Sequence, residues 1–72
     1  MENMKPLDAL NTFLGNQVLV KLKNGMSIRG TLKAFDIHIN LVLDDAEYNE
    51  EDDVTKKVKT LFVRGDMILF VS

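Results

Sequence analysis

The chain contains no cysteine, no tryptophan, one proline and one histidine among its 72 residues. Without cysteine it can form neither a disulfide nor a cysteine-based metal site. A chain this short buries only about 60% of the surface that it exposes when unfolded, so its own core gives limited stability. Because disulfides are excluded, we expect oligomerisation to supply part of the stability.

Long hydrophobic runs are also missing. No apolar stretch comes near the roughly 20 residues that a membrane-spanning helix needs. The first six residues, MENMKP, lack the apolar centre of a secretory signal. We therefore expect a single domain, residues 1–72, that is cytoplasmic and does not bind membranes.

Groups suited to catalysis are few. His38 is the single histidine, and the only serines are Ser27 and Ser72. A nucleophile, a base and an orienting group therefore cannot be assembled within one chain. The acidic residues at 44–53 lack the spacing and the glycine of a Ca²⁺-binding loop. The sequence predicts a protein that is not an enzyme and that has no metal site and no cofactor.

The net charge is −2, but the charges are unevenly distributed. Seven of the eleven acidic residues lie within residues 44–53, where there is no basic residue. The rest of the chain has nine basic and four acidic residues, a balance of +5. Since charges are screened beyond a Debye length of about 8 Å, nucleic-acid binding is possible if the acidic segment is held away from the site.

Hydrophobic periodicity predicts one helix and five strands. Pro6 suits the first turn of a helix over residues 5–14, and Gly15 suits its end. After residue 16 the period changes to two, and Asn24 followed by Gly25 is a strong hairpin signal. The predicted strands cover residues 16–23, 26–35, 40–48, 58–63 and 67–71, with a polar loop at 49–57.

Alternation along these strands predicts which side chains form the core. The inward-facing set is Val18, Val20, Leu22, Met26, Ile28, Leu32 and Ala34. Phe35 faces outward by the same alternation. Gly30 lies within the inward face, and a glycine there allows the sharp bend that a small barrel needs. The prediction is a mainly β fold, in which a short N-terminal helix precedes a strongly bent, five-stranded antiparallel SH3-like barrel.

The fifth predicted strand, MILFV, is apolar on both faces. Such a strand is normally covered on both faces, and a barrel of this size covers only one. We expect a second copy of the chain to cover the other face, with Leu61 and Val63 on the outward side of the fourth strand. The alternative is that the N-terminal helix covers it. The predicted oligomer interface consists of Leu61, Val63, Ile68 and Phe70.

Two segments between apolar runs hold the polar groups most suited to binding. Residues 35–40 read FDIHIN and residues 63–66 read VRGD. They supply the imidazole of His38, the amide of Asn40 and the guanidinium of Arg64. The first and last can stack on a base and the amide can bond to its edge, as in recognition of single-stranded RNA.

Simpler roles for the same side chains exist. His38 can be a solvated loop residue, and Asn40 can satisfy backbone groups of its own turn. Arg64 and Asp66 can form an exposed ion pair across the second turn, worth under about 1 kcal/mol.

The two segments resemble the signature motifs of the Sm and Sm-like (LSm) family. The first motif resembles residues 25–44 and the second resembles residues 61–68, LFVRGDMI. The similarity covers nearly the whole chain and is closest to the archaeal Sm-like proteins. It implies the Sm fold, in which the fourth strand of one subunit pairs with the fifth strand of the next. It also implies a homomeric ring of seven subunits and a non-catalytic ribonucleoprotein role in RNA processing, as a scaffold or chaperone.

The resemblance further implies a uracil pocket and a U-rich single-stranded RNA partner. His38 and Arg64 would enclose the base, and Asn40, held in one orientation by Asp36, would bond to its edge. The RNA-binding residues implied by the motifs are Asp36, His38, Asn40, Arg64, Gly65 and Asp66. The alternative is a monomeric SH3-like adaptor for Pro-rich peptides, although a chain without tryptophan provides little for an aromatic groove.

Overall fold

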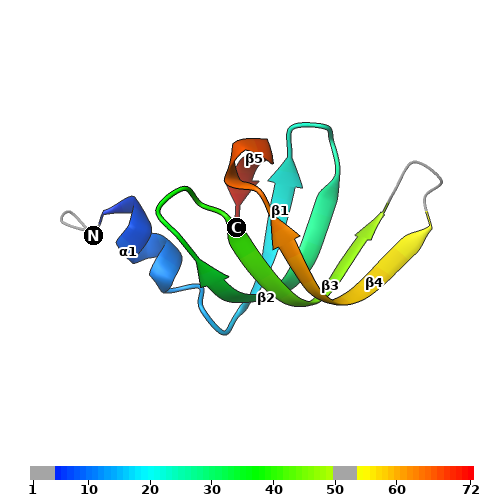
Figure 1. Cartoon of the computed structure of the whole chain (residues 1–72), viewed down its shortest axis with the longest axis horizontal. Coiled ribbons are helices and arrows are strands. Elements are labelled where there is room, and N and C mark those ends of the chain that lie inside the picture. Colours follow the sequence, from blue (N-terminus) through cyan, green and yellow to red (C-terminus); the bar gives the residue numbers. More distant parts are fainter. Residues whose placement is uncertain (1–4, 50–53) are drawn as a thin grey trace.

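The computed structural model describes residues 5–49 and 54–72 (Figure 1). The α-helix, α1 (Pro6–Asn11), has proline in its first turn, as predicted. It is shorter than the predicted range because residues 12–15 form turns, and Gly15 has a φ of 81°. Within the described residues, no helix is long and apolar enough to cross a membrane.

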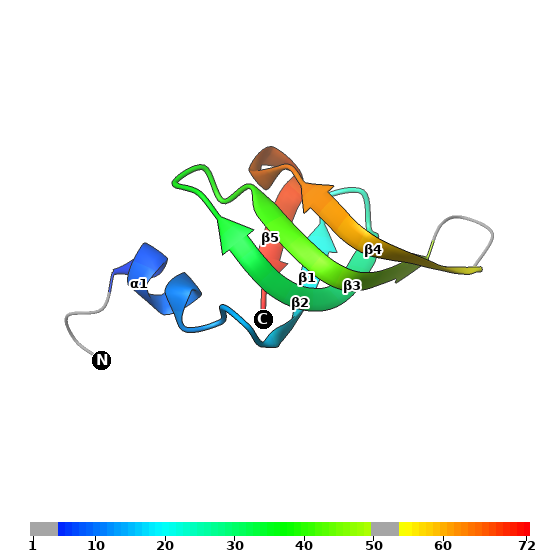
Figure 2. The same ribbon diagram turned by 60° about the horizontal axis from the view of Figure 1, so that its bottom comes forward.

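Five antiparallel strands form one curved sheet (Figures 1 and 2). They are β1 (Gln17–Leu22), β2 (Ser27–Phe35), β3 (Leu41–Asn49), β4 (Thr55–Val63) and β5 (Ile68–Val71). The strand order is β4-β3-β2-β1-β5, so β4 and β5 are the two edges. Since no ladder joins β4 to β5 in the described residues, the prediction is confirmed as a bent five-stranded sheet and not as a closed barrel.

The polar loop predicted at 49–57 is shorter than expected. β4 begins at Thr55, and its first residues pair with the end of β3, where Asn49 lies opposite Thr55. The acidic residues 50–53 lie outside the described residues.

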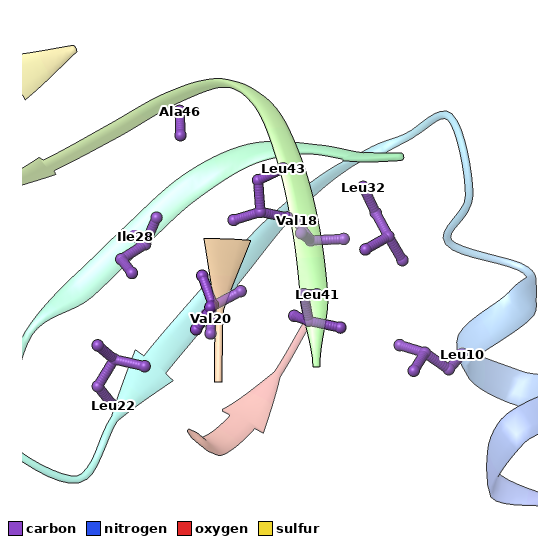
Figure 3. Packing of buried hydrophobic residues seen from close by; sticks show 10 residues of the cluster. Leu10, Val18, Val20, Leu22, Ile28, Leu32, Leu41, Leu43 and Ala46 are labelled. Atoms are coloured by element: carbon purple, nitrogen blue, oxygen red, sulfur yellow. The ribbon is translucent and has the colours of Figure 1, made fainter. Parts of the chain in front are cut away.

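The core takes apolar side chains from α1 and from β1 to β4 (Figure 3). Val18, Val20 and Leu22 are at most 8% exposed, which confirms the predicted inward face of β1. The other buried hydrophobic residues are Leu10, Ile28, Leu32, Leu41, Leu43, Ala46 and Val63. α1 therefore contributes to the core through Leu10.

β3 packs very closely on β2 at Gly30. The pairing of these strands shifts register between Arg29 and Thr31. A Cβ atom on Gly30 would lie 3.2 Å from both the Ala46 Cα and the Asp44 carbonyl oxygen. Glycine is suited to such an approach because it has no side chain, and the irregularity lies where the sequence predicts a bend.

The alternation of inward and outward side chains changes phase along β3. Leu43 and Ala46 are both fully buried although they are three residues apart. Asp45, between them, has a left-handed φ of 51°. A residue in this conformation breaks the pleat, as in a β-bulge, so the following side chains exchange faces.

β4 follows the same phase change because it pairs with β3. Leu61 lies opposite Leu43 and packs against the core, and Val63, opposite Leu41, is only 6% exposed. The prediction that Leu61 and Val63 face outward is therefore wrong. The outward side chain is Phe62, which is 77% exposed.

A second irregularity changes the end of β2. The pairing with β3 shifts register between Leu32 and Ala34. Ala34 is exposed, contrary to the prediction, and Phe35 packs against the core instead of facing outward. Alternation counted from Ile28 fails here because a bulge inserts an extra residue into one strand.

The last strand follows a short 3₁₀ helix, η1 (Gly65–Met67). Ile68 and Val71 pack against the core, whereas Leu69 and Phe70 are 60% and 52% exposed. In Figure 1, α1 lies at the opposite end of the molecule from the paired ends of β3 and β4. It does not cover Leu69 and Phe70, which stay exposed. Within one copy, the alternative in which the helix covers this strand is therefore wrong.

Candidate nucleic-acid interface

The loop between β2 and β3 is organised by the carboxylate of Asp36. Its Oδ1 accepts hydrogen bonds from the backbone N–H groups of His38 (2.9 Å) and Asn40 (3.1 Å). The Ile39 N–H donates to the Asp36 carbonyl oxygen at 3.0 Å, and Ile39 has a left-handed φ of 61°. An aspartate that bonds to the backbone two residues ahead is typical of a tight turn, so Asp36 sets the course of the loop.

The side-chain amide of Asn40 is held at both ends. Its Nδ2 donates to Asp36 Oδ2 at 3.0 Å, and its Oδ1 accepts from the Gly65 N–H at 2.8 Å. A carboxylate only accepts and a backbone N–H only donates, so the reversed amide would lose both bonds. After these two bonds, Asn40 keeps one N–H and one oxygen lone pair for a ligand.

Gly65 brings the second turn against the first loop. A Cβ on Gly65 would collide with the His38 carbonyl oxygen and would lie 2.9 Å from the Ile39 carbonyl carbon. The close approach therefore requires glycine at this position. The same approach brings Gly65 to Asn40, which lies twenty-five residues earlier in the chain.

Arg64 and Asp66 form an ion pair within the second turn. Arg64 Nη2 lies 2.8 Å from Asp66 Oδ2, and both side chains are largely exposed. Such an exposed pair is worth under about 1 kcal/mol, so its main effect is to orient the guanidinium. The side chain of His38 is exposed at the tip of the neighbouring loop.

A groove of about 520 Å³ lies on the outer side of this region. Its polar lining comes from Asp36, Asn40 and Arg64, and its apolar lining includes Ala34, Val42 and Phe62. His38 is not part of the lining, so the groove extends away from the His38 side of the loop. The sequence analysis missed Phe62, because its alternation was assigned in the wrong phase.

Hydrogen bonding lowers the pKa of Asp36. The bond from the Asn40 side chain is the largest cause, followed by those from the backbone N–H groups of Asn40 and His38. Together they hold the pKa of this carboxyl below its ordinary value of 3.8. Asp36 is therefore ionised at neutral pH and acts only as an acceptor.

The structure thus joins most of the predicted site residues. Asp36, Asn40 and Gly65 form one hydrogen-bonded unit, the backbone of His38 contacts Gly65, and Arg64 is bonded to Asp66. The simpler expectation of an Arg64–Asp66 ion pair is also met. No sequence feature predicted the bond between Asn40 and Gly65.

Comparison with known proteins gives a family model, the LSM domain, that matches residues 8–72. The chain belongs to this family. It is 50% identical over 68 residues to an Sm-like protein of Archaeoglobus fulgidus, covering 94% of this chain and 88% of that one. An Sm-like protein of Pyrococcus horikoshii is 44% identical over 68 residues, which cover 94% of this chain and 91% of the relative.

Solved structures of LSM-domain proteins are similar to this chain throughout. The Sm protein of Pyrococcus abyssi, solved in complex with a uridine heptamer, has 42% identity and a TM-score of 0.86. That match covers 96% of this chain and 97% of the other. A heptameric archaeal Sm protein has 45% identity and a TM-score of 0.80, over 89% of this chain and 93% of the other. The predicted Sm fold is confirmed by these matches.

Proposed function

We propose that this LSM-domain protein binds single-stranded, U-rich RNA and does so as a ring of identical subunits. The observation that supports this most directly is the Asn40 amide, held in one orientation by Asp36 and Gly65. An amide with one fixed donor and one fixed acceptor can read the edge of a base. That the similar Pyrococcus abyssi protein was solved with a uridine heptamer favours the same ligand here.

The fixed amide favours uracil over cytosine. Uracil presents its N3–H donor beside a carbonyl acceptor, which matches the free lone pair and free N–H of Asn40. Cytosine presents the opposite pattern at these two atoms, so donor would face donor and acceptor would face acceptor. A bidentate base contact of this kind discriminates by about 1–3 kcal/mol.

His38 and Arg64 supply flat groups that can stack on the base. Because Gly65 contacts the His38 backbone, the side chains of His38 and of Arg64, the neighbour of Gly65, start from nearby points of the backbone. Stacking on a base contributes about 1–3 kcal/mol by alanine substitution. Asp66 orients the guanidinium of Arg64 through their 2.8 Å bond.

The two edges of the sheet are suited to assembly. β4 and β5 each have one side without a partner strand in the described sheet, and both carry exposed apolar side chains: Phe62, Leu69 and Phe70. Exposed apolar side chains on an edge strand favour pairing with another chain; β5 has no charged residue, and the lysines of β4 lie at 56–59, in the part of the strand before Phe62. Pairing of β4 with the β5 of the next copy is head-to-tail, and it closes into a ring if the rotation allows. Similar proteins of this family are heptamers, so we propose seven subunits.

The corrected orientations change how the interface is formed. Leu61 and Val63 pack into the core of their own subunit and so hold β4 against it. The contact to the next copy therefore uses the β4 backbone and Phe62. On β5, Phe70 is the exposed member of the predicted interface, whereas Ile68 packs inward.

A repeated site gives a scaffolding role rather than catalysis. Several pockets in one ring can bind successive bases of one strand, which raises the overall affinity without new contacts. We infer that the ring holds short U-rich stretches as a scaffold or chaperone in RNA processing, without cofactor or metal. A monomeric peptide-binding adaptor is the second candidate, and the bent five-stranded sheet by itself is compatible with it.

Two measurements test the proposal. Light scattering should give a mass several times the 8.2 kDa of the protomer. Fluorescence anisotropy should show oligo-U bound more tightly than oligo-C of equal length, and Asn40→Ala should abolish the preference. Asn11→Ala, at the exposed end of α1, serves as the matched control and should keep it. Equal affinities in the unmodified protein would contradict base reading, and a stable monomer that binds a Pro-rich peptide would favour the adaptor.

A further inference from the structure

The outer face of the sheet changes character next to the candidate site. Most cross-strand rows on this face are polar, such as the row in which Arg29, Glu47 and Lys57 are neighbours across β2, β3 and β4. One row is apolar: Ala34 lies opposite Val42, and Val42 lies opposite Phe62. This apolar row lines the same groove as Asp36, Asn40 and Arg64.

Phe62 stands at the open side of that groove. It is 77% exposed and belongs to β4, an edge strand whose outer side faces no partner in the described sheet. A phenylalanine this exposed leaves most of its apolar surface in water, which is unfavourable unless something covers it. Whatever pairs with β4 would lie directly beside Phe62 and would form the missing wall of the groove.

The opposite edge of the same chain carries a matching side chain. Phe70 pairs with Lys21 of β1, whereas its neighbour Val71 pairs with the buried Val20. Phe70 therefore lies on the outer face, with Lys21, and it is 52% exposed. β5 contains no charged residue and no proline that would prevent pairing along its free edge.

We propose that the groove lined by Asp36, Asn40 and Arg64 takes part in nucleotide binding and is shared between two copies: β5 of the next subunit extends the sheet at β4 and places the partner's Phe70 beside Phe62. Cross-strand aromatic pairs on one face are favourable, and here the pair would close the open side of the groove. The inference rests on the proposed ring. It adds that each site is completed by a residue of the adjacent subunit, so the ring does more than present several copies of one site.

A ligand too short to reach two sites distinguishes completion of one site by the neighbouring subunit from avidity across several sites. Uridine 5′-monophosphate cannot gain affinity from several pockets, so any dependence of its binding on the neighbour reports a shared site. We expect Phe62→Ala and Phe70→Ala rings of unchanged mass to bind it at least about fivefold more weakly, within the range of an aromatic pair. The control Leu14→Ala, a partly exposed residue after α1 and outside the groove, should stay within about twofold.

Mixed rings give a sharper test. Asn40→Ala chains keep Phe70, and Phe70→Ala chains keep Asn40, so neither variant alone forms a complete site. When the two chains are co-expressed in equal amounts and mix at random, about a quarter of the interfaces between adjacent subunits should combine Asn40 of one subunit with the partner's Phe70. NMR titration should then detect a fraction of sites with the affinity of the unmodified ring.

The outcomes are distinguishable from failure of the proposed function. If the unmodified ring binds oligo-U but Phe62→Ala and Phe70→Ala rings bind uridine 5′-monophosphate normally, the shared site is overturned while RNA binding stands. If the unmodified protein is monomeric or does not bind oligo-U, the proposed function fails first. If the alanine variants lose the ring, Phe62→Leu and Phe70→Leu replace them; weakened mononucleotide binding in these rings supports the inference, and normal binding overturns it.

Discussion

The side-chain oxygen of Asn40 accepts a 2.8 Å hydrogen bond from the backbone N–H of Gly65, in a turn that follows a different pair of strands. The nitrogen of the same amide donates to Asp36 at 3.0 Å. One amide therefore links the β2–β3 loop to the turn after β4, and a bond from each of these segments fixes its orientation.

Asp36→Asn should reduce base selectivity without disrupting the loop. An asparagine at 36 can still accept from the backbone N–H groups of His38 and Asn40, but its own NH₂ group no longer fixes the Asn40 amide in one orientation. We expect the ratio of oligo-U to oligo-C affinity to fall by about tenfold, which corresponds to about 1.4 kcal/mol. Anisotropy titrations measure the ratio, and Asp45→Asn, at an exposed left-handed position in β3, is the matched control.

Gly65→Ala should destabilise the protein. The added Cβ would collide with the His38 carbonyl oxygen, and backbone atoms cannot move aside as a flexible side chain can. Overpacking of this kind costs about 1–3 kcal/mol. Urea unfolding at a fixed protomer concentration measures the loss, with the exposed neighbouring variant Asp66→Ala as the control. Equal urea midpoints for Gly65→Ala and Asp66→Ala would mean that the two turns can move apart without a loss of stability.

Arg64→Lys should weaken oligo-U binding although the charge is kept. Lysine is a point charge without a planar face, so stacking on a base is lost while attraction to phosphate remains. We expect a loss of about 1–3 kcal/mol in oligo-U affinity with an unchanged dependence of log affinity on log salt concentration. A change in the salt slope with little loss of affinity would instead assign Arg64 to phosphate contact.

The Asp36 carboxyl should titrate below its ordinary pKa of 3.8. Because its pKa is lowered in the folded state, the stabilisation that it gives is present above the unfolded value and is lost as pH falls through the folded value. NMR amide signals of His38 and Asn40, which donate to this carboxylate, should shift together with a midpoint below pH 3.8. In Asp36→Asn the shared transition should disappear. A midpoint at or above 3.8 in the unmodified protein would contradict the role of these bonds.

Much of the architecture could be predicted from local pattern. The inward side of β1 alternates cleanly from Val18 to Leu22, and Pro6 lies in the first turn of the helix, as its fixed φ requires. The sequence motifs alone indicate Asp36, Asn40 and Gly65 as site residues. The bond between Asp36 and Asn40 agrees with the role that the resemblance implies for Asp36, but the bond between Asn40 and Gly65 was not predictable from spacing, because Gly65 meets Asn40 only after β3 and β4 have paired in register.

The errors cluster where the strands depart from regular pleating. Ala34 follows a register shift, and Leu61 and Val63 lie beyond the phase change at Asp45 on the paired strand. A count of alternate residues assumes that the pleat is unbroken, so one irregular residue reverses every later assignment on that strand. Phe62 was misplaced for the same reason, and with it one wall of the groove.

The amino-acid sequence alone determined the number and order of the strands, the glycines that turns and close packing require, and the polar groups available for a base. These depend on short-range backbone preferences, which neighbouring residues are enough to set. Only the tertiary structure decided which face Phe62 and Val63 occupy and how the Asn40 amide is oriented. Both depend on strand pairing and on contacts between distant segments, where a single bulge or one missing Cβ atom determines the result.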